Sequence, residues 1–220
     1  MRQPLQRQVV ALLAAVTPGS SEAEIAALPL GLRDAKLLDL RETLFGPDLA
    51  TIVACPACGA QLEASFAVDD VRVPPDTGTT LAIETAGHHV AFRPPATNDL
   101  LAIPASADAE IARATLLARC VTTDMPPDAL PPELLPAIAE GMARADPQAV
   151  VELELHCAGC AHGFLAIFDI AGFLMREIHN WARQMLRDID SLARAYGWRE
   201  ADILALSPTR RQIYLEMVAR

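Results

Sequence analysis

The sequence predicts an α+β protein in which a small β core of two hairpins is surrounded by N-terminal, inserted and C-terminal helices. Two observations carry this prediction. Alternating apolar and polar residues flank two short cysteine pairs, and longer stretches place apolar residues at helical spacing. The 220 residues have 52% hydrophobic content, which is ample for a packed core.

The cysteine pairs are Cys55-Pro-Ala-Cys58 and Cys157-Ala-Gly-Cys160, which lie far apart in the chain. A C-x2-C turn lets both of its sulfurs reach one tetrahedral zinc ion at about 2.3 Å. The two pairs together supply four thiolates, which is a complete ligand set for a structural zinc site. We therefore interpret Cys55, Cys58, Cys157 and Cys160 as two halves of one zinc site.

The flanks of the two pairs resemble each other. Laying Thr51–Val68 over Leu153–Ile170 aligns both pairs and much of the apolar pattern. Alternation of this kind marks half-buried strands, so each pair is predicted at the tip of a β-hairpin, and two such hairpins make a zinc ribbon. Gly59 follows the first pair, whereas Gly159 lies inside the second, so the second turn is predicted to be built differently.

Other readings of the cysteines are two local disulfides, a redox pair, or thiols without metal. A thioredoxin-type redox pair begins a helix, but here the residues after each pair continue as strand. Cys120 lies in the apolar helical run Ile111–Val121 and is interpreted as a small buried hydrophobe. His162 could replace a ligand or bond a thiolate, but a surface position on the hairpin is the favoured interpretation.

The charge and the apolar pattern of the sequence indicate which kind of partner the protein binds and in which cellular compartment it lies. The net charge of −10 argues against nucleic-acid binding, which normally uses a basic face, and favours protein partners. The run Val9–Val16 has helical spacing and is interpreted as a packed helix rather than a secretory signal. No apolar stretch approaches the length of about 20 residues that spans a membrane. Reduced cysteines without an export signal indicate the cytoplasm.

The first fifty residues are predicted to form two or three helices. Ser21 and Glu24 have the spacing of a capping box, Pro29 and Gly31 are expected to break the pattern, and a later helix stops at Gly46. The whole chain is divided into an N-terminal helical region 1–50, hairpins 51–73 and 148–170, a mainly helical insertion 74–147, and a C-terminal helical region 171–220.

The insertion is expected to begin with a loop and a strand and to continue as helices. Thr97 or Asn98 is predicted to cap a helix that begins at Asp99. The other expected elements are a polar loop at Pro74–Thr80, a strand ending in His89–Arg93, helices at Asp108–Val121 and Pro132–Ala145, and a proline-rich turn at Met125–Pro132.

The strongest helical pattern runs from Ala171 to Tyr196, followed by Gly197, a short helix, and a last helix capped by Ser207 and Pro208. Four arginines lie along one ridge opposite its apolar face, and such a ridge could bind an acidic partner. A solvated face, neutralised by the nearby Asp188 and Asp190, is the favoured interpretation. The ridge consists of Arg176, Arg183, Arg187 and Arg194.

No catalytic motif stands out in the sequence. It contains no G-x-S-x-G, no phosphate-binding glycine loop and no H-E-x-x-H. A four-cysteine zinc site leaves no open coordination position, so it is expected to be structural. The chain is therefore expected not to be an enzyme.

Several segments resemble one family. The C-terminal stretch from Trp181-Ala-Arg through Ala195-Tyr-Gly-Trp to Leu215 is similar to T-even-phage-type baseplate hub assembly chaperones, encoded with phage-tail-like contractile injection particles of bacteria. The segment Ala27–Asp34, the paired cysteines and the Phe92-Arg-Pro-Pro stretch look like the same family. The resemblance therefore touches nearly the whole chain.

The resemblance implies a non-enzymatic protein that assembles or forms part of the baseplate hub, with other baseplate or hub proteins as its partners. The alternative function, based on the zinc ribbon alone, is an adaptor or regulatory protein unrelated to tails. A hydrolase is a weaker third option, because it would need an open metal site. The sequence leaves the oligomeric state open.

Overall fold

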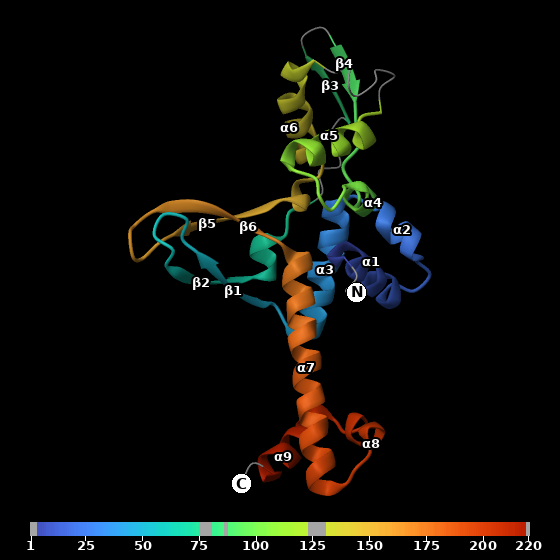
Figure 1. Ribbon diagram of the computed structural model, residues 1–220, viewed down its shortest axis with the longest axis vertical. Coiled ribbons are helices and arrows are strands. Elements are labelled where there is room, and N and C mark those ends of the chain that lie inside the picture. Colours follow the sequence, from blue (N-terminus) through green and yellow to red (C-terminus); the bar gives the residue numbers. More distant parts are fainter. Residues whose placement is uncertain (1–3, 75–80, 86–87, 123–130, 219–220) are drawn as a thin grey trace. The chain divides into compact units, whose positions relative to one another are not determined.

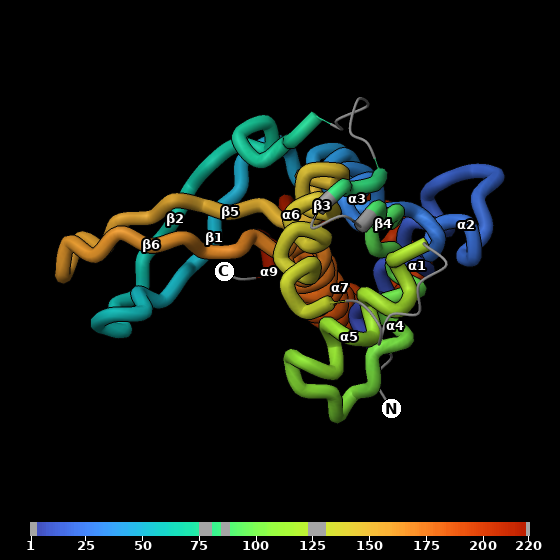
Figure 2. The backbone as a smooth tube through the Cα atoms, turned by 90° about the horizontal axis from the view of Figure 1, so that it is seen from above, coloured from blue at the N-terminus to red at the C-terminus, as the bar shows by residue number. Residues whose placement is uncertain are grey.

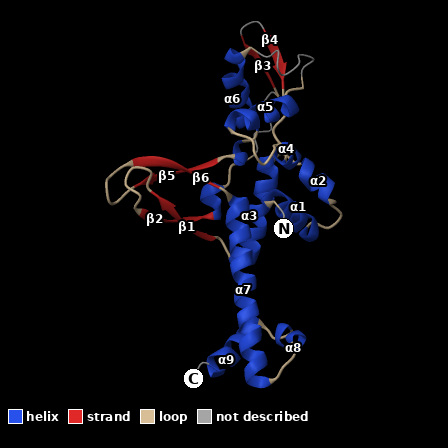
Figure 3. Cartoon of the chain, viewed as in Figure 1, coloured by secondary structure: helices blue, strands red, loops and turns tan. Residues whose placement is uncertain are grey.

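Helices and three two-stranded antiparallel sheets make up the part of the chain that the computed structural model describes, namely residues 4–74, 81–85, 88–122 and 131–218. This mixture of helices with small hairpins (Figure 3) confirms the predicted fold class. The chain divides into two compact units, residues 1–172 and 173–220.

The first unit begins with three helices. They are α1 (Leu5–Val16), α2 (Glu22–Ala27) and α3 (Leu30–Phe45). The capping box of α2 is confirmed, because Ser21 Oγ accepts from the Glu24 N–H and Glu24 Oε2 accepts from the Ser21 N–H. Gly46, with φ of 86°, ends α3 at the predicted position.

Gly31 does not break a helix as predicted. It is the second residue of α3 and is buried, and its N–H donates to Asp146 Oδ2 at 2.8 Å. An added Cβ would collide with the Asp146 carboxylate and lie 3.0 Å from the Ala149 backbone nitrogen. Glycine is needed here because the end of the insertion approaches the α3 backbone closely.

Arg33 and Asp34 form a buried ion pair on α3, in which Arg33 Nε donates to Asp34 Oδ1 at 2.7 Å. Burial raises the pKa of Asp34 to about 6 against the opposing charge of Arg33, and the nearby Asp146 and Asp169 carboxylates raise it further. The core of this unit therefore holds a carboxyl group whose pKa lies well above its ordinary value.

The two cysteine hairpins lie side by side in this unit (Figures 1 and 2). Along their strands, half-buried and exposed residues alternate, as predicted. Phe66 and Phe168 meet edge to face across the two hairpins, with ring centroids 5.2 Å apart. The strands are β1 (Asp48–Ala54) paired with β2 (Gln61–Ala67), and β5 (Val151–His156) paired with β6 (Gly163–Phe168).

The insertion between these hairpins has its own small core of Val90, Leu117, Leu134 and Ile138. The predicted loop and proline-rich turn fall largely outside the described residues. The described elements are the 3-10 turn Val68–Val71, β3 (Ala82–Thr85), β4 (His88–Ala91), α4 (Thr97–Ala102), α5 (Ala109–Cys120), the 3-10 turn Pro132–Leu134, α6 (Leu135–Ala145) and the 3-10 turn Pro147–Ala149.

The predicted cap of α4 is wrong. Helix α4 begins at Thr97 itself, and Asp99 Oδ2 accepts from the N–H of Ala96, the N-cap residue, at 2.9 Å. Asp99 therefore caps from inside the first turn, where a carboxylate also interacts favourably with the helix dipole.

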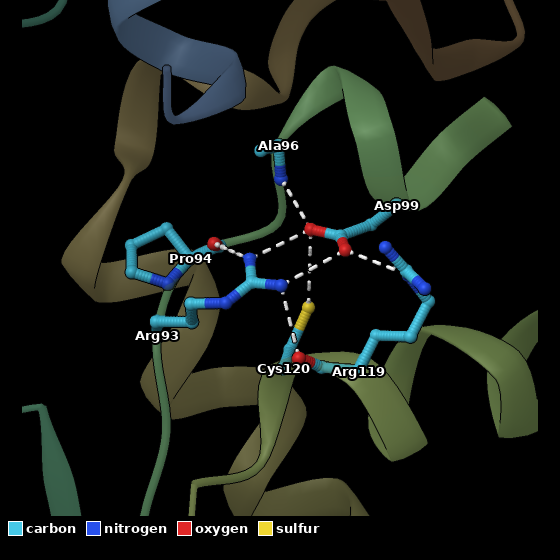
Figure 4. A network of polar contacts seen from close by, with 6 residues as sticks. All are labelled: Arg93, Pro94, Ala96, Asp99, Arg119 and Cys120. Carbon is cyan, nitrogen blue, oxygen red and sulfur yellow. Dashed lines mark hydrogen bonds and ion pairs between the residues drawn. The ribbon is translucent and has the colours of Figure 1, made fainter. Parts of the chain in front are cut away.

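Asp99 is also the centre of a polar network (Figure 4). Two nitrogens of Arg93 donate to its two carboxylate oxygens at 2.6 and 2.9 Å, and Arg119 Nε donates at 2.8 Å. Cys120 is buried, as predicted, and its thiol lies 3.8 Å from Asp99 Oδ2. Burial alone would raise the pKa of Asp99, but the hydrogen bonds from Arg93, Ala96 and Arg119 outweigh it and lower the pKa to about 2.

The second unit is helical in its described residues. Gly197, with φ of 68°, follows the long helix at the predicted position, and Ser207 Oγ accepts from the Arg210 N–H at 3.3 Å, which confirms the predicted cap. Tyr196, Trp198 and Tyr214 pack against one another, with centroids 4.6 to 5.7 Å apart. The helices are α7 (Ile170–Tyr196), whose first residues belong to the first unit, α8 (Glu200–Leu204) and α9 (Pro208–Val218).

Candidate functional site: a four-cysteine metal centre

Each cysteine pair occupies the tip of its hairpin, as predicted. In the first turn the Cys55 N–H donates to the Ala60 carbonyl at 2.8 Å, and the Gly59 N–H donates back to the Cys55 carbonyl at 2.9 Å. These bonds close a tight turn in which Cys55 is buried and Cys58 is exposed. The first hairpin thereby presents both of its sulfurs from one turn.

The second turn has the same hydrogen bonds, so the prediction that it is built differently is wrong. Its Cys157 N–H donates to the His162 carbonyl at 2.9 Å, and its Ala161 N–H donates to the Cys157 carbonyl at 2.8 Å. Ala161 has φ of 56° and takes the left-handed position that Gly59, with φ of 74°, takes in the first turn. A residue with a Cβ is strained there.

The two hairpins bring all four sulfurs together. The four Sγ atoms lie within 4.8 Å of one another. The shortest contacts join different hairpins: Cys55 Sγ lies 3.7 Å from Cys160 Sγ, and Cys58 Sγ lies 3.6 Å from Cys157 Sγ. All four cysteines are free thiols in the structure.

This arrangement fits a tetrahedral metal ion. Four sulfurs at about 2.3 Å from a zinc ion are about 3.8 Å from one another, which is close to the cross-hairpin distances. Backbone donors also surround the cluster, because the N–H groups of Cys160 and Gly159 donate to the Cys157 sulfur and lower the pKa of this thiol to about 7.

The two thiols of the second pair differ in pKa. The His162 N–H lowers the pKa of Cys160, but hydrogen bonds shared with the neighbouring thiols outweigh this effect and raise the pKa to about 12. A bound divalent cation would remove the mutual repulsion of the thiolates. The chemistry of the donor set therefore matches a metal that prefers sulfur ligands.

Two other residues considered as participants lie outside the cluster. His162 is exposed, and its ring stacks on Phe164 with centroids 6.1 Å apart. Cys120 lies in the network around Asp99. Within the described residues, the four cysteines form the one group of three or more side chains placed to hold a metal ion.

The predicted arginine ridge is exposed along α7, but its members differ in their contacts. Arg194 Nε donates to Asp190 Oδ1 at 2.9 Å, and Arg187 donates to Gln184 at 3.0 Å. Arg176 and Arg183 have no side-chain partner among the residues that the structure describes. Neutralisation by aspartate therefore reaches only one end of the ridge, and acidic-partner binding by the four arginines stays a prediction.

Sequence reasoning missed the network around Asp99. Its members come from three separate segments, and the sequence offers no spacing rule that joins Arg93 to Arg119. The only local signal is the interval from Ala96 to Asp99, which matches an N-cap residue and the third helical residue.

Comparison with known proteins places the chain in a family. The sequence model described as T4 bacteriophage base plate protein matches residues 3–123, just over half of the chain. No curated protein and no solved structure matches. Among the described residues, none of the helices is both long and apolar enough to cross a membrane. The matched region includes the first hairpin and ends before Cys157, and it is sufficient to show that the chain belongs to the T4 bacteriophage base plate protein family.

Proposed function

We propose that this protein is a non-enzymatic assembly or structural component of the baseplate hub in a phage-tail-like contractile injection particle. The observation that carries the proposal is the family match over residues 3–123. The resemblance of the C-terminal stretch to hub assembly chaperones supports the finer assignment. The partners are other baseplate or hub proteins, and the protein is made in the cytoplasm, where its thiols stay reduced.

The metal in this proposal is a zinc ion bound by Cys55, Cys58, Cys157 and Cys160. Four thiolates fill a tetrahedral zinc ion and leave no position for water or substrate, so its role is structural. The ion would hold together two hairpins that are distant in sequence, and binding of this kind contributes on the order of 10 kcal/mol to folding.

The zinc assignment is tested by metal analysis of purified protein. Wild type is expected to contain one zinc ion per chain, and Cys157→Ser is expected to lose it and to unfold at a lower temperature. Cys120→Ser is the matched control, because Cys120 lies outside the cluster. Wild-type protein without metal, whose stability is unchanged by a chelator, would defeat the assignment.

The functional assignment is tested by deleting the gene in its bacterial host. Electron microscopy is expected to show sheath and tube material without complete baseplates, and wild-type protein supplied from a plasmid is expected to restore them. Complete particles in the deletion strain would refute the proposal. Mass spectrometry of purified particles then separates a permanent component from an assembly factor that leaves.

The rival function, an adaptor or regulator unrelated to tails, makes a different prediction in the same strain. A regulator would change transcript levels of its target genes, whereas an assembly protein leaves baseplate transcripts unchanged. The net charge of −10 weighs against a nucleic-acid target. Membership of the base plate family favours the assembly role.

A further inference from the structure

The two units of the chain differ in charge. Residues 1–172 contain ten Lys and Arg against 22 Asp and Glu, a net charge of −12, whereas residues 173–220 contain eight Arg against six Asp and Glu, a net charge of +2. The C-terminal unit is therefore the basic part of an acidic protein. An acidic surface would be repelled by the first unit and attracted by the second.

The C-terminal unit also has a thin core. Among its described residues, Phe173, Leu174 and Met175 at the start of the unit are buried, and after them only Leu192, Ile203 and Arg211. The unit exposes seven large apolar side chains: Trp181, Leu186, Tyr196, Leu204, Ile213, Met217 and Val218. Exposed large apolar side chains provide contacts with another protein where several of them share one face.

Two helices of the unit repeat one combination of residues. On α7, Arg183 precedes Leu186 by three residues, and Leu186 is 62% exposed. On α9, Arg210 precedes Ile213 by three residues and Met217 by seven, and these apolar side chains are 48% and 58% exposed. Residues at this spacing share one helix face, so each helix presents a cation beside an apolar anchor.

Arg183 and Arg210, the cations on these two helix faces, have no carboxylate partner among the described residues. Arg183 has no side-chain partner among the described residues. Among the described residues, the Arg210 guanidinium contacts the uncharged side chain of Tyr214, 5.8 Å from its ring centroid and with its NH2 group 3.5 Å from the tyrosine hydroxyl. Neither arginine is neutralised by a carboxylate of the described chain, so each can pair with an acidic group from outside.

We propose that the C-terminal unit docks an acidic amphipathic helix of a partner baseplate protein. Leu186, Ile213 and Met217 supply apolar contacts, and Arg183 and Arg210 pair with carboxylates flanking the partner's apolar stripe. Apolar stripes at helical spacing fit the ridges of a second helix, which is the usual mode of helix recognition. This inference rests on the proposed function, because it names the surface through which that function acts.

The test uses the full chain and the baseplate proteins encoded beside it, co-expressed and then measured by calorimetry. Leu186→Glu and Arg183→Glu are each expected to weaken binding about tenfold or more, as changes at an interface centre do. Ile167→Glu is the matched control, because Ile167 is a 73% exposed apolar residue on β6 of the first unit. It is expected to bind like wild type. Added salt is expected to weaken partner binding by wild type more than partner binding by Arg183→Glu.

Each outcome decides a different question. If a baseplate protein binds wild type and both C-terminal variants equally, the docking surface is wrong while the proposed function stands. If no baseplate protein binds wild type, the proposed function fails and this inference fails with it. If Leu186→Glu instead changes the mass of the isolated chain in light scattering, the surface pairs with a second copy, and the stated partner is wrong. Circular dichroism checks that each variant is folded.

Discussion

Replacing Asp99 by asparagine tests whether the polar network of the first unit stabilises the fold. The Asp99 side chain is 1% exposed and pairs with Arg93 and Arg119, whose side chains are 39% and 42% exposed. Asparagine keeps the shape and an oxygen that can accept from the Ala96 N–H, but it removes the charge. The substitution therefore isolates the ionic part of the network.

The expected loss of stability in Asp99→Asn follows from the pKa of Asp99. Lowering this pKa from 3.8 to about 2 corresponds to about 2.4 kcal/mol of stability at neutral pH. Losing one partner of a fully buried pair costs about 3–5 kcal/mol, but the half-exposed Arg93 and Arg119 regain water, so the smaller figure applies. Asp99→Ala also removes the acceptor for the Ala96 N–H and is expected to cost about 1 kcal/mol more.

The sign of the pH dependence is fixed by the direction of the shift. A depressed carboxyl pKa contributes stability above about pH 4, and that stability is lost as pH falls toward the folded pKa. The difference between wild type and Asp99→Asn is expected to shrink to about half near pH 3. Urea unfolding followed by far-UV circular dichroism measures this difference in stability. Tryptophan fluorescence is less suitable, because both tryptophans, Trp181 and Trp198, lie in the other unit. A difference below about 0.5 kcal/mol at pH 7 would refute the reasoning.

Four further substitutions test other parts of the first unit. Ala161→Gly is expected to raise stability by about 1 kcal/mol and Gly59→Ala to lower it similarly, because both positions are left-handed; equal melting temperatures would contradict this. Gly31→Ala is expected to cost about 1–3 kcal/mol in urea unfolding, because its Cβ would displace Asp146, and an unchanged midpoint would disprove that contact. The free energy of unfolding of wild type is expected to rise by about 1.3 kcal/mol from pH 7 to pH 5, because a raised carboxyl pKa favours the folded state in acid. Asp34→Asn is expected to lack this rise. If urea titrations give both proteins the same change in unfolding free energy with pH, Asp34 is not its source.

Local patterns predicted the elements of this fold well. The capping box at Ser21, the helix end at Gly46, the two hairpins and the long helix to Tyr196 all depend on residues within a few positions of one another. The cysteine cluster was predictable because two matching spacings point to one tetrahedral ion. These signals need no knowledge of how distant segments meet.

Two features of the fold were not predictable from residue type alone. Gly31 reads as a helix breaker in sequence, but it is a helical residue kept small by the approach of Asp146. Ala161 gives no sign of a left-handed conformation, because alanine rarely adopts it, yet the hydrogen bonds of the hairpin tip impose it. A tertiary contact in the first case, and the hydrogen bonds of the turn in the second, outweigh a residue preference worth about 1 kcal/mol.

A metal ion bound by the four cysteines would also affect the docking surface proposed above. Strand β6 carries the second cysteine pair's hairpin and ends at Phe168, and α7 begins two residues later, at Ile170. Between them, Asp169 Oδ1 accepts from the Gly172 N–H at 3.0 Å and ties the strand end to the first turn of the helix. A metal bound by Cys157 and Cys160 would therefore fix the hairpin whose second strand leads into α7, the helix that carries Leu186. Cys157→Ser is therefore expected to weaken partner binding although it changes no residue of the docking surface. Leu186→Glu is expected to weaken partner binding and to leave the metal content unchanged. Measuring metal content and partner affinity on both variants separates the role of the metal centre from that of the docking surface.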